Sequence, residues 1–163
     1  MCIRDSPFPL PLSVPNSTVL IMTRFGLDVT LAHPPGYELD QKIIEQAKEN
    51  AENSGGSFEI KHSIKEAYQD ADIIYVKSWC SLKYYGKPKE EKKFRLPYRG
   101  IWICNDELME LTNKNSIFMH CMPIRRNIVA TDSVCDGKHS VIYDQAENRL
   151  HVQKGLLVSI LKS

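Results

Sequence analysis

The chain has 163 residues, of which 42% are hydrophobic, and its 21 basic and 20 acidic side chains nearly balance. This length corresponds to about one domain, and the near-zero net charge argues against nucleic acid or a membrane surface as a partner. No apolar run approaches the roughly 20 residues that span a bilayer, and no signal peptide is visible, so we expect a cytoplasmic protein. The five cysteines are scattered without paired spacing, which argues against disulfides and structural zinc. No cofactor or metal is expected.

Residues 1–6 differ from the rest of the chain. They show no periodicity, they join abruptly to the proline-rich residues 7–11, and they resemble the translated remnant of a sequencing adapter. We therefore interpret residues 1–6 as a non-native leader and residues 7–163 as the domain. The alternative is an ordinary disordered chain end.

Helix and strand signals alternate after this start. Asn16 and Ser17 are candidate N-caps for a helix at residues 18–25, which Gly26 ends. Asp40 is a candidate N-cap for a second helix, which Gly55 ends. The other predicted elements are strands at 28–31, 57–61, 73–76, 117–119 and 140–143, and helices at 64–70, from Asn105 or Asp106 to 111, and at 145–161.

Two segments carry further expectations. Residues 78–99 contain a mixed charge run at 87–93, which is more typical of a solvated loop than of a binding patch. In the last helix, Ala146, Leu150, Leu157 and Leu161 are spaced for burial on one face.

The alternation of strands with helices of about ten residues predicts an α/β fold. We expect a doubly wound, mainly parallel sheet with helices on both faces, similar to a Rossmann fold. The first predicted element is a helix, whereas a βαβ order would place a strand before the proline-rich stretch. We therefore expect the first central strand to be missing.

Polar side chains follow the predicted strands at their carboxyl ends. Lys77 follows the strand at 73–76, His120 and Cys121 follow the strand at 117–119, and Arg149 lies early in the last helix. The carboxyl ends of parallel strands lie at one edge of a sheet, where open α/β folds bind their ligands. A cation near a helix N-terminus is unfavourable unless an anion lies beside it. The sequence therefore predicts a site for an anionic ligand.

Each of these residues also has a simpler explanation. Arg149 could form a surface ion pair, and Cys121 could be a small buried hydrophobic residue. A cysteine hydrolase that uses Cys121 with His120 is weaker still, because adjacent residues on an extended segment point in opposite directions.

Several motifs together resemble the aspartate/ornithine carbamoyltransferase superfamily. The string His120–Pro123 (HCMP) is similar to its HCLP signature, with a volume-conserving change of leucine to methionine. The segments FMHCMPIRRN (118–127), LPLSVPNS (10–17), GYELD (36–40) and ENR (147–149) look like the branch that carbamoylates N-acylated ornithine. The resemblance covers residues 7–163 and only the second, amino-acid-binding domain of such enzymes.

The resemblance implies roles for individual residues. Cys121, Met122 and Arg149 would contact carbamoyl phosphate, with Cys121 as a contact residue in catalysis and not a nucleophile. Lys77 and Arg125 would hold an N-acyl-L-ornithine. The implied enzyme transfers the carbamoyl group to the ornithine δ-amine in arginine biosynthesis, and it would be a homotrimer at full length.

Lys77 separates the branches of this superfamily. Ordinary ornithine carbamoyltransferases carry an aspartate at the matching place, which suits a free α-ammonium group. A lysine would repel that group, whereas an α-amide carries no charge. An N-acyl-L-ornithine is therefore expected, with acetyl favoured over succinyl, although Val129 stands where N-acetylornithine relatives carry a lysine.

Two alternatives stay open. The first is an ordinary ornithine carbamoyltransferase, and the second is a non-catalytic α/β module that binds an anion through Arg149 and Arg125. The Ser-x-Arg-Thr phosphate motif of the first domain does not occur in this sequence, so we expect the chain alone to be inactive.

Overall fold

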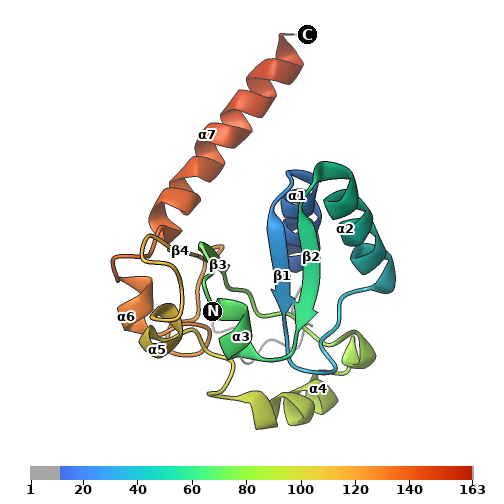
Figure 1. The fold of residues 1–163 in the computed structure, drawn as a ribbon, viewed down its shortest axis with the longest axis vertical. Helices are drawn as coiled ribbons and strands as arrows, with labels where there is room; N and C mark the ends of the chain where they lie inside the picture. Colours follow the sequence, from blue (N-terminus) through green and yellow to red (C-terminus); the bar gives the residue numbers. More distant parts are fainter. Residues whose placement is uncertain (1–11, 163) are drawn as a thin grey trace. The chain divides into compact units, whose positions relative to one another are not determined.

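The computed structural model describes residues 12–162 of the chain (Figure 1). The interpretation of residues 1–6 as a leader lies outside this range. The described residues form two compact units, one made of residues up to 69 and 77–102, the other of residues 70–76 and those from 103 onward. No helix within the described range is long and apolar enough to cross a membrane.

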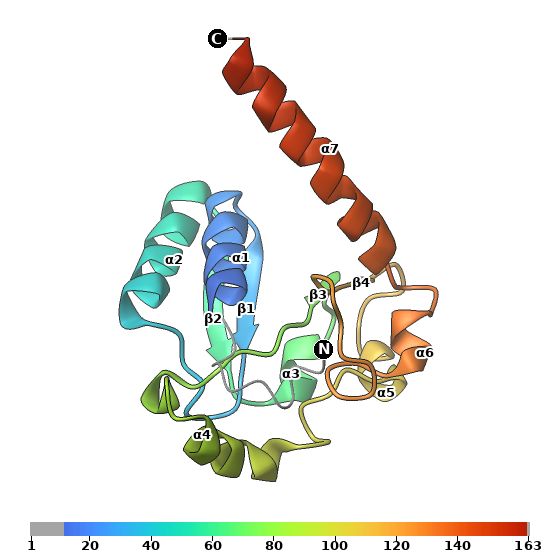
Figure 2. The same ribbon diagram turned by 180° about the vertical axis from the view of Figure 1, so that it is seen from behind.

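The first unit is built on a parallel pair of strands. β1 (Asp28–Ala32) pairs with β2 (Ser57–Lys61), in register from Asp28 opposite Ser57 to Ala32 opposite Lys61. Two helices, α1 (Ser13–Arg24) and α2 (Gln41–Ser54), pack side by side along this pair (Figures 1 and 2). The remaining elements are α3 (Ile64–Tyr68), η2 (Leu82–Tyr84), α4 (Pro88–Arg95) and η3 (Leu96–Tyr98).

The core of the first unit lies between α1, α2 and the strands. Its buried members are Val19, Leu31, Leu39, Ile44 and Ala47. The ends of α2 follow the sequence prediction, because the Asp40 side chain accepts from the Lys42 N–H at 2.9 Å and Gly55 adopts the left-handed conformation with φ of 80°. An aspartate cap and a glycine after the last turn satisfy backbone groups that a helix leaves unpaired.

The first helix begins earlier than predicted. α1 already includes Asn16 and Ser17, which we expected to cap it, and its N-cap residue Leu12 makes no side-chain capping bond. Pro15 lies in the first turn of α1, where its missing N–H costs nothing because the first four N–H groups have no partner within the helix.

Residues 78–99 are not a solvated loop, contrary to our expectation. They contain α4 between the two 3₁₀ turns. Pro88 begins α4, acidic residues lie in its first turn and basic residues in its last turn, an order that favours a helix through its dipole. Glu91 is buried and pairs with Arg95 one turn later. The mixed charge run therefore is the pattern of a short helix.

The second unit contains another parallel pair. β3 (Ile73–Tyr75) pairs with β4 (Ile117–Met119), with Ile73 opposite Ile117 and Tyr75 opposite Met119. Three helices complete this unit: α5 (Asp106–Met109), α6 (Asp132–Cys135) and α7 (Ile142–Leu161). α6 had no counterpart among the predicted elements. Within the described range the strands thus form two two-stranded parallel sheets, and helices alternate with them as the α/β prediction requires.

The predicted strand at 140–143 is wrong, because α7 begins at Ile142. The N–H of Phe118 donates to the His139 carbonyl at 2.7 Å, and the N–H of Val141 donates to the Phe118 carbonyl at 3.0 Å. Only Ser140 is bridged to β4 in this way. Helix α7 begins at Ile142, because the Gln145 N–H already donates to the Val141 carbonyl at 2.9 Å.

The predicted burial along the last helix is wrong. Leu150, Leu157 and Leu161 are 56%, 57% and 82% exposed, and Ile142 is the buried residue of α7. The helix leaves the rest of its unit soon after its first turns (Figure 2). Apolar spacing creates an apolar face, but burial also requires a partner surface, and the described residues do not provide one for this part of α7.

Candidate active site

The HCMP motif lies at the carboxyl end of β4, where the sequence predicted it. His120 is buried, Cys121 is half-buried, and Met122 is exposed and joined to Pro123 by a cis peptide bond. Arg125 follows in the same loop and is half-buried. A strand therefore delivers a thiol, backbone groups and a guanidinium group to one loop of the second unit.

The neighbouring guanidinium group, Arg126, holds this loop to the helices that follow. It donates to Asp132 at 2.9 Å, to both carboxylate oxygens of Asp136 at 2.6 Å, and to the Tyr143 hydroxyl at 3.3 Å. These hydrogen bonds lower the pKa of Asp132 and of Asp136 and raise the pKa of Arg126. Two carboxylates thus neutralise Arg126, to which the sequence analysis assigned no role, whereas Arg125 was the predicted substrate contact.

Gln145 and Tyr75 join the start of α7 to both strand ends. The Gln145 Oε1 accepts from the His120 N–H at 3.0 Å, and its Nε2 donates to the Tyr75 hydroxyl at 3.2 Å. Burial raises the pKa of Tyr75, and the neighbouring Cys121 thiol raises it further. Neither Gln145 nor Tyr75 was a candidate site residue, although Gln145 stands four residues before Arg149, a spacing that puts both on one helix face.

Arg149 is exposed on α7, in the same unit as Cys121, Met122 and Arg125. No hydrogen bond or ion pair joins its guanidinium group to the rest of residues 12–162. The surface ion pair that could have explained it is therefore not formed within this part of the chain. A guanidinium group without a protein partner is suited to a phosphate or carboxylate, which it binds through two parallel hydrogen bonds.

Lys77 belongs to the first unit and is half-buried, two residues after the end of β3. The residues after it are firmly held. The Trp79 indole donates to the Tyr37 carbonyl at 2.9 Å, and Arg95 donates to the Trp79 carbonyl at 2.5 Å. The Arg95 guanidinium also lies 5.0 Å from the centre of the Tyr37 ring. These contacts order the segment that carries Lys77, and Arg95 was not predicted to have this role.

Two histidines follow the strands of the first unit. His33 comes directly after β1 and is buried; its Nδ1 lies 2.9 Å from the Pro34 carbonyl, so Nδ1 donates. Its Nε2 is buried without a hydrogen-bond partner among the described residues. His62 follows β2, and its Nδ1 lies 2.9 Å from the His33 carbonyl. Burial lowers the pKa of His33, and the nearby His62 lowers it further, against the opposing effects of the Pro34 carbonyl and Glu38.

Because His33 is buried with a lowered pKa, we expect the stability of the fold to decrease in acid. The unfolded chain binds a proton at His33 near pH 6.5, whereas the folded chain resists protonation, so the free energy of unfolding should fall as pH drops below that value. The expected slope is at most about 1.4 kcal/mol per pH unit for one proton. Urea unfolding between pH 8 and 5 measures it. His33→Asn retains a donor to Pro34 without titrating and should flatten the fall, while the exposed His151→Asn should not. Equal slopes in both variants would contradict this.

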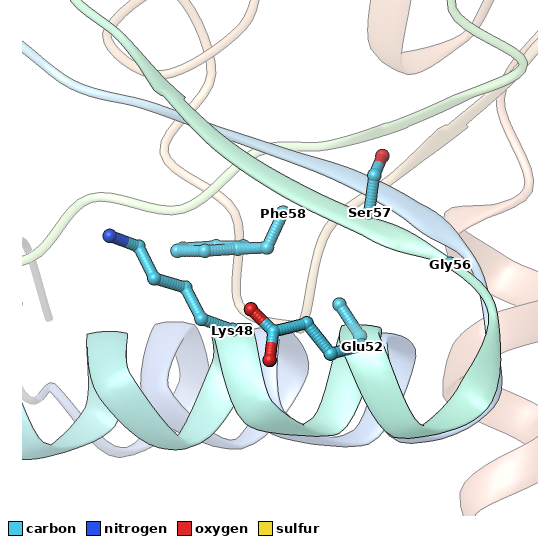
Figure 3. A pocket seen from close by; sticks show the side chains of 6 residues that line it. Lys48, Glu52, Gly56, Ser57 and Phe58 are labelled. Atoms are coloured by element: carbon cyan, nitrogen blue, oxygen red, sulfur yellow. The ribbon is translucent and has the colours of Figure 1, made fainter.

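A separate hollow lies between α2 and β2 (Figure 3). It has a volume of about 300 Å³ and contains the side chains of Lys48, Glu52 and Phe58 in its wall. None of the predicted site residues lines it. Within residues 12–162 there is also no group of three histidine, cysteine, aspartate or glutamate residues placed to hold a metal ion.

Comparison with known proteins agrees with the motifs. Residues 12–160 match the family model of the aspartate/ornithine carbamoyltransferase Asp/Orn-binding domain. N-acetylornithine carbamoyltransferase of Xanthomonas axonopodis pv. citri is 45% identical over 94% of this chain and 45% of its own length. Ornithine carbamoyltransferase of Thermococcus kodakarensis is 40% identical over 91% of this chain and 46% of its own length. The chain thus spans about half the length of the relatives it matches.

Solved structures show the same likeness. Acetylornithine transcarbamylase in complex with acetylcitrulline superposes with a TM-score of 0.88 at 44% identity, over 94% of this chain and 46% of that one. The same values hold for a variant of N-acetyl-L-ornithine transcarbamylase bound to carbamyl phosphate and N-succinyl-L-norvaline. The predicted α/β fold and the predicted family are both confirmed. This chain belongs to the aspartate/ornithine carbamoyltransferase family and corresponds to its Asp/Orn-binding domain.

Proposed function

We propose that this chain is the amino-acid-binding part of an N-acylornithine carbamoyltransferase, with acetyl favoured over succinyl as the acyl group. The observation that carries the proposal is the likeness, over 94% of the chain, to N-acetylornithine carbamoyltransferases, one of them solved with acetylcitrulline. The half-buried Lys77 supports it, because an ammonium group repels the free α-ammonium of ornithine and leaves an α-amide unaffected.

The family resemblance suggests the substrate contacts, and the charges of the residues support them. Cys121, Met122 and Arg149 would contact carbamoyl phosphate, and the Arg149 guanidinium, which has no ion-pair partner within residues 12–162, suits its phosphate. Lys77 and Arg125 would bind the acylated amino acid, whose free carboxylate needs a cation. Cys121 would act as a contact residue in catalysis.

The reaction needs no covalent enzyme intermediate. The δ-amine of the acylornithine attacks the carbamoyl carbon, the new N–C bond forms, and the C–O bond to phosphate breaks. The amine proton leaves with the phosphate, and an N-acylcitrulline remains, as a step of arginine biosynthesis. Catalysis then consists of positioning the two substrates and stabilising the charge of the departing phosphate.

Further parts of the proposal follow from the sequence and from the family resemblance. Residues 7–163 would be the acylornithine-binding domain, and residues 1–6 a non-native leader. The complete protein would contain the carbamoyl-phosphate half that its relatives carry, would work in the cytoplasm and would be a homotrimer. The proposed reaction involves no cofactor.

The test is a substrate comparison with the complete protein, recovered by extending the gene upstream. Carbamoyl transfer from carbamoyl phosphate is measured with N-acetylornithine, N-succinylornithine and ornithine as acceptors. We expect kcat/KM to be highest for N-acetylornithine. A preference for ornithine would instead support an ordinary ornithine carbamoyltransferase. A natural start codon without a phosphate-binding half, together with no transfer to any acceptor, would support the non-catalytic anion-binding module.

A further inference from the structure

The Gln145 side chain connects three elements of the second unit. It lies in the first turn of α7, accepts from the His120 N–H just after β4 at 3.0 Å, and donates to the Tyr75 hydroxyl at the end of β3 at 3.2 Å. Both ends of the carboxamide are used, so the group cannot rotate without losing a hydrogen bond. One side chain thus joins the ends of two neighbouring strands to the start of the helix.

These contacts lie directly beside the proposed carbamoyl-phosphate residues. His120 immediately precedes Cys121. The Tyr75 hydroxyl lies against Cys121, whose thiol raises the pKa of Tyr75 and whose backbone lowers it. On the helix side, Gln145 precedes Arg149 by four residues, so the two residues share a face of α7. The Gln145 amide therefore ties the backbone just before Cys121 to the first turn of α7, one turn before Arg149.

We propose that Gln145 is a positioning residue: it holds the Cys121–Met122 backbone and the turn that carries Arg149 in one fixed arrangement, so that both can contact the same carbamoyl phosphate. This inference rests on the proposed function. In this proposal Gln145 itself contacts neither substrate, because its carboxamide is used by His120 and Tyr75. Its effect is transmitted through His120 on one side and through the α7 backbone on the other.

A purely structural role makes a different prediction. If Gln145 only stabilised the fold, its loss would lower the urea midpoint and leave the KM values of the folded enzyme unchanged. A positioning role instead raises the KM for carbamoyl phosphate selectively, because the contacts to that substrate no longer form together. Loss of one well-placed hydrogen bond corresponds to about a tenfold change in an equilibrium constant.

The experiment uses the complete enzyme with three variants. Gln145→Met keeps a side chain of similar length without hydrogen-bonding groups, Tyr75→Phe removes only the hydroxyl that Gln145 contacts, and Gln153→Met makes the same change at an exposed position of the same helix. We expect the KM for carbamoyl phosphate to rise about tenfold in Gln145→Met. The KM for N-acetylornithine should change less than about twofold, which is below the effect of one lost hydrogen bond. Gln153→Met should match the parent enzyme.

The combined variant tests the bridge itself. With Gln145→Met in place, Tyr75→Phe has no Gln145 amide left to lose, so it should raise the KM for carbamoyl phosphate by less than it does in the parent enzyme; if the two effects multiply instead, the bridge is overturned. Should Gln145→Met fail to fold, Tyr75→Phe carries the test with a smaller, still selective rise in KM.

Arg149→Ala separates this inference from the proposed function. If Arg149→Ala raises the KM for carbamoyl phosphate and neither Gln145→Met nor Tyr75→Phe does, the positioning role is overturned and the proposed function stands. If Arg149→Ala also leaves that KM unchanged, the proposed phosphate contact falls, and the positioning role falls with it.

Discussion

Replacing Arg149 with alanine is expected to weaken carbamoyl phosphate binding by the complete enzyme about 100-fold. Truncating one partner of a hydrogen-bonded charge pair that the bound ligand buries typically costs about 2–5 kcal/mol, and a 100-fold loss corresponds to about 2.7 kcal/mol. Arg149 is exposed and makes no ion pair within residues 12–162, so the free energy of unfolding should stay unchanged. Calorimetric titration with carbamoyl phosphate and urea unfolding measure the two quantities.

Two further variants sharpen this prediction. Arg149→Lys keeps the positive charge but loses the planar fork, so it should lie between the parent enzyme and Arg149→Ala. Arg24→Ala removes an exposed arginine from the last turn of α1, has no proposed role at the site, and should bind carbamoyl phosphate normally. An affinity of Arg149→Ala within twofold of the parent enzyme would exclude the phosphate contact, since even one lost hydrogen bond is worth about tenfold.

Replacing Lys77 with aspartate is expected to move acceptor preference from N-acetylornithine toward ornithine. Two unit charges about 4 Å apart interact by about 4 kcal/mol near a protein surface, and the substitution reverses the sign of that interaction for an α-ammonium group. We expect the ratio of kcat/KM for N-acetylornithine to that for ornithine to fall at least about 100-fold, equivalent to about 2.7 kcal/mol. Steady-state kinetics with both acceptors, at saturating carbamoyl phosphate, give this ratio.

Matched variants test whether charge is the cause. Lys77→Met removes the positive charge without adding a negative one and should produce an intermediate ratio. Lys114→Asp makes the same charge reversal on an exposed turn residue and should leave the ratio unchanged. If Lys77→Asp lowers both kcat/KM values equally, Lys77 does not discriminate between the two acceptors, and the charge argument for an acylated substrate fails.

The sequence predicted best where structure depends on near neighbours. Asn105 caps α5 by accepting from the Leu108 N–H at 3.0 Å, as Asp40 caps α2. The strands at 57–61 and 117–119 have the predicted bounds. Caps and strand patterns act over a few residues, so they can be recognised without knowing the rest of the fold.

Prediction failed where a distant partner decides the outcome. The spacing of Leu150 and Leu157 predicted burial, yet both are exposed because no surface among the described residues covers that part of α7. Residues 140–143 predicted a strand, yet only Ser140 forms a β-bridge with β4 before α7 begins. The mixed charges at 87–93 predicted a solvated loop, yet this segment forms α4, in which Glu91 pairs with Arg95.

For the candidate site, the sequence by itself determined the family and the residues that follow β3 and β4, because motif and strand signals are local. Only the tertiary structure decided which of these residues are engaged by the protein. It showed Arg126 neutralised by Asp132 and Asp136. It also introduced Gln145, which bonds partners 25 and 70 residues away along the chain. Hydrogen bonds across such separations depend on where two strand ends and a helix start meet in space, and no local pattern specifies that meeting point.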